Sequence, residues 1–140
     1  MPFRFLPDVA LADVAFEPSS ATAGGLFGQA AAAMTEVMVD RRTLREKTTK
    51  ELSLKADDLE RLLYDFLTEI IVLKDVDSLL FKTFEVELDE RDFALKARLA
   101  GEKIDRERHK LRNDVKAVTM HMFGVKRDGK RWKATVVLDI

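Results

Sequence analysis

The stretch that decides the fold runs from Asp57 to Ile71 and reads Asp57-Asp58-Leu59-Glu60-Arg61-Leu62-Leu63-Tyr64-Asp65-Phe66-Leu67-Thr68-Glu69-Ile70-Ile71. Its apolar residues recur at intervals of three and four, which places them on one face of an α-helix. Asp57 is expected to cap the first turn, with Glu60 three residues later completing a capping box. The other face mixes acids and bases, which argues against a membrane-surface helix. The pattern predicts a core helix.

A second helix is predicted on the N-terminal side of this one, over residues 25–39. Four consecutive alanines favour a helix and permit close packing. One face carries apolar side chains at helical spacing: Leu26, Ala30, Met34 and Met38. Before this helix, residues 3–6 and 11–17 alternate like short strands, and residues 18–22 are expected to form a turn.

The rest of the chain predicts strands. Alternating or apolar runs are expected at residues 48–55, 81–88, 93–99, 115–126 and 131–140. Residues 89–92 are expected to form a hairpin turn, and Asp128-Gly129 is a strong hairpin signal. We therefore predict a single α+β domain over residues 1–140. It should have one mainly antiparallel sheet with two packed helices, and residues 79–102 are a candidate β-rich insert.

Composition excludes several classes of site. The chain has 140 residues, 46% of them hydrophobic and 35% charged, which is typical of a soluble globular protein. It has no cysteine, so disulfides, a thiolate nucleophile, a cysteine-ligated zinc and an iron–sulfur cluster are excluded. The N-terminus lacks the features of a signal peptide, and no stretch is long and apolar enough to span a membrane. We expect a cytoplasmic protein.

Charge is unevenly distributed although the formal net charge is only −1. Residues 103–133 hold eleven lysines and arginines against four acids. Such a region can attract phosphates or an acidic protein face. A solvated hairpin surface is the alternative, and the sequence leaves both open.

The end of the chain is the first candidate site. Three apolar residues precede Asp139, and the Ile140 carboxylate follows directly. A carboxylate among apolar neighbours needs a cation or several hydrogen-bond donors. Together with Asp13, these groups would form an all-oxygen site suited to Ca²⁺, Mg²⁺ or Mn²⁺. This grouping requires the first and last strands to be neighbours, which periodicity does not establish, and Asp13 can equally be an exposed strand acid.

Other candidate residues are weaker. His121 shares strand parity with Thr119 and Phe123, and a lone histidine is more often structural than a ligand or a base. Lys116 can bind phosphate or be solvated, and Glu102 can be a site acid or an ordinary strand-end charge. His109 lies in a charged run and is expected at the surface. The sequence shows no glycine-rich phosphate loop and no Ser/His/Asp signature, so no complete catalytic apparatus is visible.

Four stretches, in order along the chain, resemble those of the archease family. They are Ala12-Asp13-Val14, residues 57–67, Gly101-Glu102 with His109 and residues 115–121, and the terminal Asp139-Ile140. The family usually has His-Thr-Ala-Asp at the first stretch, whereas this chain has Ala10-Leu11-Ala12-Asp13. The histidine and threonine are missing, and Asp8 is a candidate to replace the lost polar group.

The resemblance implies a non-enzymatic helper of the RtcB-type RNA ligase, which joins RNA ends using GTP and divalent metal. Archeases promote guanylylation and turnover of this ligase in tRNA splicing and RNA repair, so RNA contact would be indirect, through the ligase. The resemblance also implies an α+β fold and a metal site at Asp13, Asp139 and Ile140. Glu102, Lys116 and His121 are supporting candidates, with Asp8.

Two other functions stay open at this point. One is a metal-dependent phosphohydrolase that uses the same acids with His121 as base. The other is a chaperone-like or RNA-binding module that uses the basic residues of 106–112 and 126–133.

Overall fold

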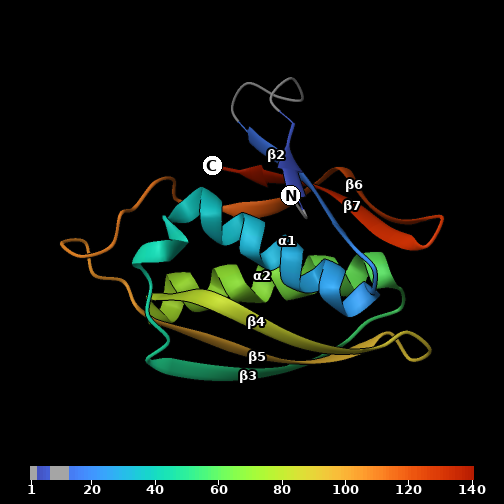
Figure 1. Cartoon of the computed structure of the whole chain (residues 1–140), viewed down its shortest axis with the longest axis horizontal. Helices are drawn as coiled ribbons and strands as arrows, with labels where there is room; N and C mark the ends of the chain where they lie inside the picture. Colours follow the sequence, from blue (N-terminus) through green and yellow to red (C-terminus); the bar gives the residue numbers. More distant parts are fainter. Residues whose placement is uncertain (1–2, 7–12) are drawn as a thin grey trace.

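The computed structural model describes residues 3–6 and 13–140 (Figure 1). Along the chain the elements are β1 (Phe3–Phe5), β2 (Asp13–Ser20), α1 (Ala23–Met38), a short 3₁₀ helix (Arg41–Thr43), β3 (Thr48–Lys55), α2 (Leu59–Asp77), β4 (Leu79–Asp89), β5 (Ala94–Lys103), β6 (Ala117–Asp128) and β7 (Arg131–Asp139). Asp8 and the Ala10-Leu11 pair lie outside the described residues.

The strands form two antiparallel sheets rather than the single sheet predicted. One has the order β1-β2-β7-β6 and the other β3-β5-β4. Figure 1 shows both helices lying between the two sheets, so the molecule has three layers around one core. The α+β class and the two packed helices are confirmed. The candidate insert at 79–102 is instead a structural layer, because β4 and β5 pair with β3 and cover the helices.

Helix α1 is buried on almost every side because it lies between the sheets. Small residues let it approach the open edge of β4. A Cβ at Gly24 would lie 3.1 Å from the Val86 carbonyl oxygen, and one at Gly28 would lie 3.6 Å from that of Phe84. The helix therefore covers an edge that would otherwise be free to pair with another chain.

Helix α2 buries the apolar face predicted from its spacing: Leu62, Leu63, Phe66, Leu67, Ile70 and Ile71. The predicted cap is wrong by one residue. Asp58, not Asp57, accepts a hydrogen bond from the Arg61 main-chain N–H at 2.7 Å. Glu60 does not complete a capping box, because its carboxylate accepts the Val125 N–H of β6 at 2.8 Å.

Two turn predictions had different outcomes. The turn expected at 18–22 is shorter than predicted and is confined to a bend at Ala21 and Thr22, since β2 continues to Ser20 by pairing with Lys133 and Trp132 of β7. The hairpin at Asp128-Gly129 is confirmed, with Asp128 opposite Arg131 and Gly129 in the left-handed region at φ 62°.

Neither helix in the described part of the chain is long and apolar enough to cross a membrane.

Candidate functional site

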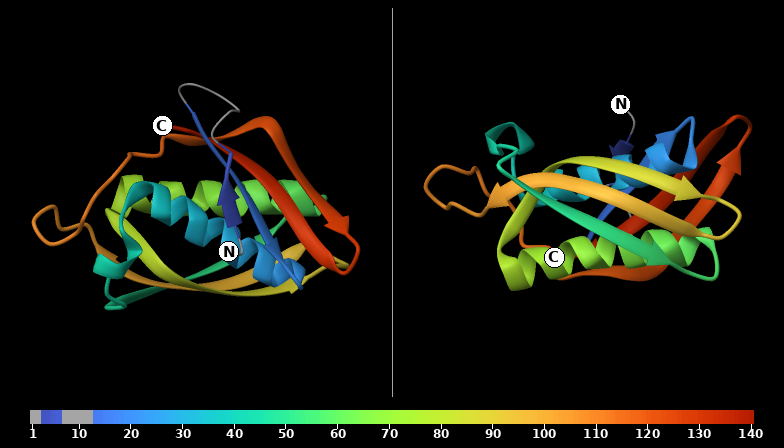
Figure 2. Two further views of the ribbon diagram at one scale, coloured as in Figure 1. Left: turned by 45° about the horizontal axis from the view of Figure 1, so that its top comes forward. Right: turned by 90° about the horizontal axis from the view of Figure 1, so that it is seen from below.

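Asp13 and Asp139 face each other at one end of the β1-β2-β7-β6 sheet. They are register partners in the antiparallel pair of β2 and β7. The strand that carries Asp13 is therefore a neighbour of the last strand of the chain, as the proposed grouping of the acids required. Directly opposite residues project to the same side of a sheet, with Cβ atoms about 4.5–5.5 Å apart. Figure 2 shows the sheet that carries this pair from two further directions.

Among residues 3–6 and 13–140, neither the Asp13 nor the Asp139 carboxylate is paired with a cationic side chain. Like charges directly opposite one another destabilise a strand pair. An oxygen-seeking cation between them would remove that repulsion, so the donor chemistry fits a hard divalent ion. Within the described chain no three His, Cys, Asp or Glu side chains gather around a common point, so a metal there would also need other oxygen donors.

The main chain fixes Asp139 on both flanks. On one side it pairs with Asp13, and on the other it pairs with Ala117 of β6. The Lys116 N–H donates to the Asp139 carbonyl at 2.8 Å, while the Lys116 side chain is exposed. The half-buried Ile140 packs against the core. Of the candidates, Asp13, Lys116, Asp139 and Ile140 are therefore brought together.

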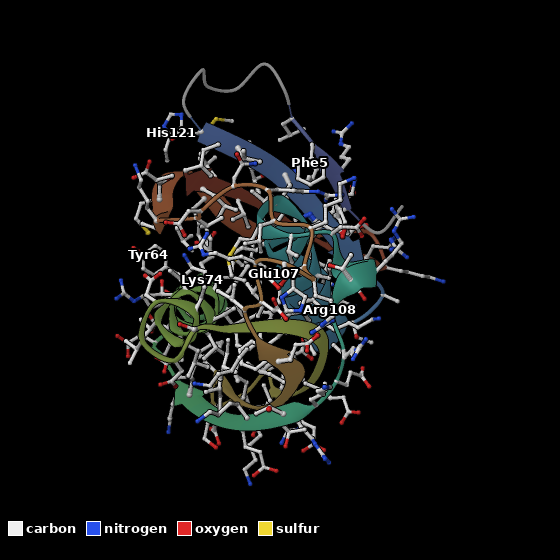
Figure 3. The ribbon with its side chains drawn as sticks, turned by 90° about the vertical axis from the view of Figure 1, so that its left-hand side faces the viewer. Phe5, Tyr64, Lys74, Glu107, Arg108 and His121 are labelled. Carbon is white, nitrogen blue, oxygen red and sulfur yellow. The ribbon has the colours of Figure 1, made fainter. Side chains whose placement is uncertain are left out.

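His121 lies in a wide bulge of β6. Pairing stops after Thr119, opposite Val137, and resumes at Gly124, opposite Thr135. Met122 has a φ of 54°, an uncommon value for a non-glycine residue. The alternation expected to place His121 with Thr119 and Phe123 is therefore interrupted. His121 is exposed on this edge strand, as Figure 3 shows.

Glu102 belongs to a separate buried cluster in the β3-β5-β4 sheet. Its carboxylate accepts hydrogen bonds from the Arg45 main-chain N–H at 2.6 Å, from Arg108 and from His109 at 2.9 Å. No hydrogen bond or ion pair joins it to Asp13 or Asp139 in the described part of the chain. Glu102 therefore positions the loop after β5 rather than the paired acids.

His109 was expected at the surface, and this is wrong. It is only 4% exposed. Its Nδ1 accepts the Asp105 N–H at 2.9 Å, which leaves the proton on Nε2 to be donated to Glu102. Burial alone would raise the pKa of Glu102, but hydrogen bonds from His109, the Arg45 main chain and Arg108 outweigh it and lower that pKa to about 2.

Lys74 ties α2 to the segment that leads into β6. It is 7% exposed, and its ammonium group donates to Asp114, to Asp75 and, at 2.9 Å, to the Val115 carbonyl. Burial would lower the pKa of Lys74, but the bonds to Asp114 and Asp75 reverse this and raise it. Through Val115 this contact fixes the residue before Lys116, next to the paired acids.

Sequence reasoning missed Arg108 and Lys74 and misplaced His109. The available signal was the Gly101-Glu102 and His109 stretch, in which an acid near the end of a strand is followed seven residues later by a histidine in the next loop. A run of alternating charges hid it, because such runs are usually solvated.

The model of the archease protein family (MTH1598/TM1083) matches residues 3–140. The chain belongs to the archease family. It is 39% identical over 118 residues to protein archease of Pyrococcus abyssi, across 81% of this chain and 82% of that one. With protein archease of Pyrococcus furiosus the identity is 35% over 133 residues, across 92% and 93%.

Solved structures agree with this assignment. The solution structure of protein 1598 from Methanobacterium thermoautotrophicum is 33% identical and superposes with a TM-score of 0.87 over 99% of both chains. The crystal structure of an archease from Thermotoga maritima superposes with a TM-score of 0.68 over 96% of both chains. At 23% identity, the latter likeness supports the archease fold alone.

Proposed function

We propose that this archease is a non-catalytic activator of a GTP-dependent RtcB-type RNA ligase in the cytoplasm, promoting ligase guanylylation and multiple turnover in tRNA splicing and RNA repair. Family membership supports the ligase as partner. The observation that carries the proposal for the site is the register of Asp13 opposite Asp139, two facing acids without an ion-pair partner in the described residues.

In this proposal Asp13, Asp139 and Ile140 supply the oxygen ligands of one divalent ion, Ca²⁺, Mg²⁺ or Mn²⁺. Such an ion supplies positive charge that can orient anionic phosphate groups. The protein's own part is to hold the acids in place: β2 and β6 flank Asp139, and the Lys116 N–H fixes its carbonyl. His121, exposed on the neighbouring bulge, borders the site, and Asp8 remains a supporting candidate.

Activation requires that the archease bind one state of the ligase better than another. A ligand shifts a conformational equilibrium only by its differential affinity for the two states. The acidic end of the sheet would border the ligase active site and stabilise the conformation competent for guanylylate transfer. The ligase binds the RNA ends in this scheme, so the paired acids contact RNA only indirectly.

The test is multiple-turnover ligation by the cognate ligase with GTP and Mn²⁺ and substoichiometric archease. Wild-type protein should raise turnover strongly, and Asp139→Asn should not, because the amide removes charge but keeps the strand pairing. Asp92→Asn is the matched control: Asp92 is an exposed acid in the β4–β5 loop, and the change should leave stimulation intact. Normal stimulation by folded Asp139→Asn, or none by wild-type protein with an active ligase, would refute the proposal.

A further inference from the structure

The β6–β7 hairpin carries a strongly basic surface far from the paired acids. We define the basic arm as Lys126, Arg127, Lys130, Arg131 and Lys133, which flank a single acid, Asp128. Figures 1 and 2 show the hairpin reaching to one end of the molecule, away from the C-terminus. The whole chain has a formal net charge of −1, so this concentration is local.

The structure separates the basic region of the sequence into two parts with different partners. In the loop before β6, Arg108 pairs with the buried Glu102, and Arg112 lies 3.7 Å from Glu36. These two side chains therefore form ion pairs within the folded protein. In the basic arm, by contrast, only Lys133 has an ion pair, at 3.1 Å from Asp128, as far as the described residues extend.

Strand register concentrates the positive charge of the arm instead of dispersing it. Lys126 and Lys133 are direct partners in the β6–β7 pair, so two lysines face each other on one side of the sheet. Like charges in that position cost stability. A polyanion that lies across both side chains would offset the repulsion.

Lys133 of the arm and Asp139 of the acidic pair lie on the same face of the sheet. Lys133 and Asp139 are separated by six positions of β7, and an even separation puts both side chains on one face. The buried Val136 and Leu138 alternate with them and enter the core, so this face points away from the helices. The separation is about 20 Å along the strand.

The hairpin also carries an aromatic side chain, on the face opposite to Lys126 and Lys133. The Arg127 guanidinium lies 5.3 Å from the ring centroid of Trp132, its cross-strand partner, and Trp132 packs against the edge of the core. Lysines with an arginine–indole pair are typical of surfaces that bind nucleic acid, where cations contact phosphates and planar groups stack on bases. An acidic protein face would need the cations but not the stacking pair.

We propose that the basic arm binds single-stranded RNA directly through its phosphate backbone. This goes beyond ligase activation, because it assigns the archease an RNA contact of its own. It holds whether or not the acidic pair activates a ligase, and it is tested without one.

The experiment measures binding of a fluorescein-labelled single-stranded RNA of about 20 nucleotides by anisotropy at several salt concentrations. The test variant is Lys126→Gln with Lys130→Gln, two exposed lysines without ion pairs in the described residues. The control is Lys55→Gln with Lys96→Gln, which removes the same charge from the exposed surface of the other sheet.

Wild-type protein and the control should bind RNA with equal affinity, which falls as salt rises. The arm variant should bind about tenfold more weakly at low salt, and its log–log salt slope should be shallower by about 1.4 for two lost phosphate contacts. RNA should also quench Trp132, the only tryptophan. Absence of wild-type binding at low salt, equal loss in both variants, or equal competition by polyglutamate would overturn the proposal.

Discussion

Replacing Glu102 by glutamine is expected to destabilise the protein by about 3 kcal/mol. The carboxylate accepts from three donors, namely the Arg45 N–H, Arg108 and His109 Nε2. A glutamine of the same shape offers one oxygen, and its NH₂ group must face at least one of these donors. The change also leaves Arg108 without its buried counter-charge. Removing one member of a buried pair costs more than the pair itself contributes.

The assay is urea unfolding at pH 7, followed by far-UV circular dichroism and Trp132 fluorescence. The matched control is Glu107→Gln, which makes the same chemical change at an exposed position of the loop that follows β5 (Figure 3). That control should change the free energy of unfolding by no more than about 0.5 kcal/mol. The Glu102→Gln variant should shift the midpoint while its m-value stays unchanged.

The same comparison has a pH signature. The pKa of Glu102 falls from an ordinary value of 4.5 to about 2 in the folded state. A carboxylate with a lowered folded pKa contributes stability that is fully present above its unfolded pKa and is lost as the pH falls through the folded value. The difference in unfolding free energy between wild type and Glu102→Gln should therefore be constant above about pH 5 and shrink toward pH 2. If it equals the Glu107→Gln difference at pH 7, or does not shrink in acid, the reasoning is wrong.

Four further substitutions test the local structure by the same unfolding assay. Asp58→Ala should lower the free energy of unfolding by about 1 kcal/mol because it removes the cap of α2, and Asp57→Ala should lower it much less. A larger loss from Asp57→Ala than from Asp58→Ala would instead support Asp57 as the cap. Gly101→Ala should cost more than 3 kcal/mol, roughly the cost of severe overpacking, because a Cβ would lie 1.9 Å from the Leu80 carbonyl oxygen. Gly129→Ala, with open space but a left-handed φ, should cost only about 1 kcal/mol, so equal losses at the two glycines would contradict the steric argument.

Elements whose signal is local were predictable from the sequence. The apolar spacing of residues 59–71 specified the buried face of α2, and Asp128-Gly129 specified the hairpin, because both depend on neighbours in the chain. The predicted capping box at the start of α2 was wrong because the Glu60 carboxylate accepts the N–H of Val125, a residue 65 positions away. The prediction of a single sheet was wrong for the same reason. An alternating pattern shows which face of a strand is buried but not which strand it pairs with.

The candidate sites show the same limit. Asp13 and Asp139 were grouped on chemistry alone, and the register of β2 and β7 supplied the proximity that periodicity lacked. His109 was misplaced because a histidine between Arg108 and Lys110 looks solvated until Glu102 and the Asp105 N–H take both of its ring nitrogens. Burial of a charged loop depends on partners that the loop itself does not contain.

Strand β7 holds the two proposed sites at a fixed separation. It carries members of both, Asp139 at one end and Lys133 near the other, about 20 Å apart. A slip of one residue would turn Val136 and Leu138 out of the core, so the register is strongly specified. Changes in the basic arm should therefore leave the acidic pair undisturbed, and the reverse. If Lys126→Gln with Lys130→Gln leaves the stimulation of ligation unchanged and Asp139→Asn leaves RNA binding unchanged, the two sites act independently; a change in either readout would contradict this.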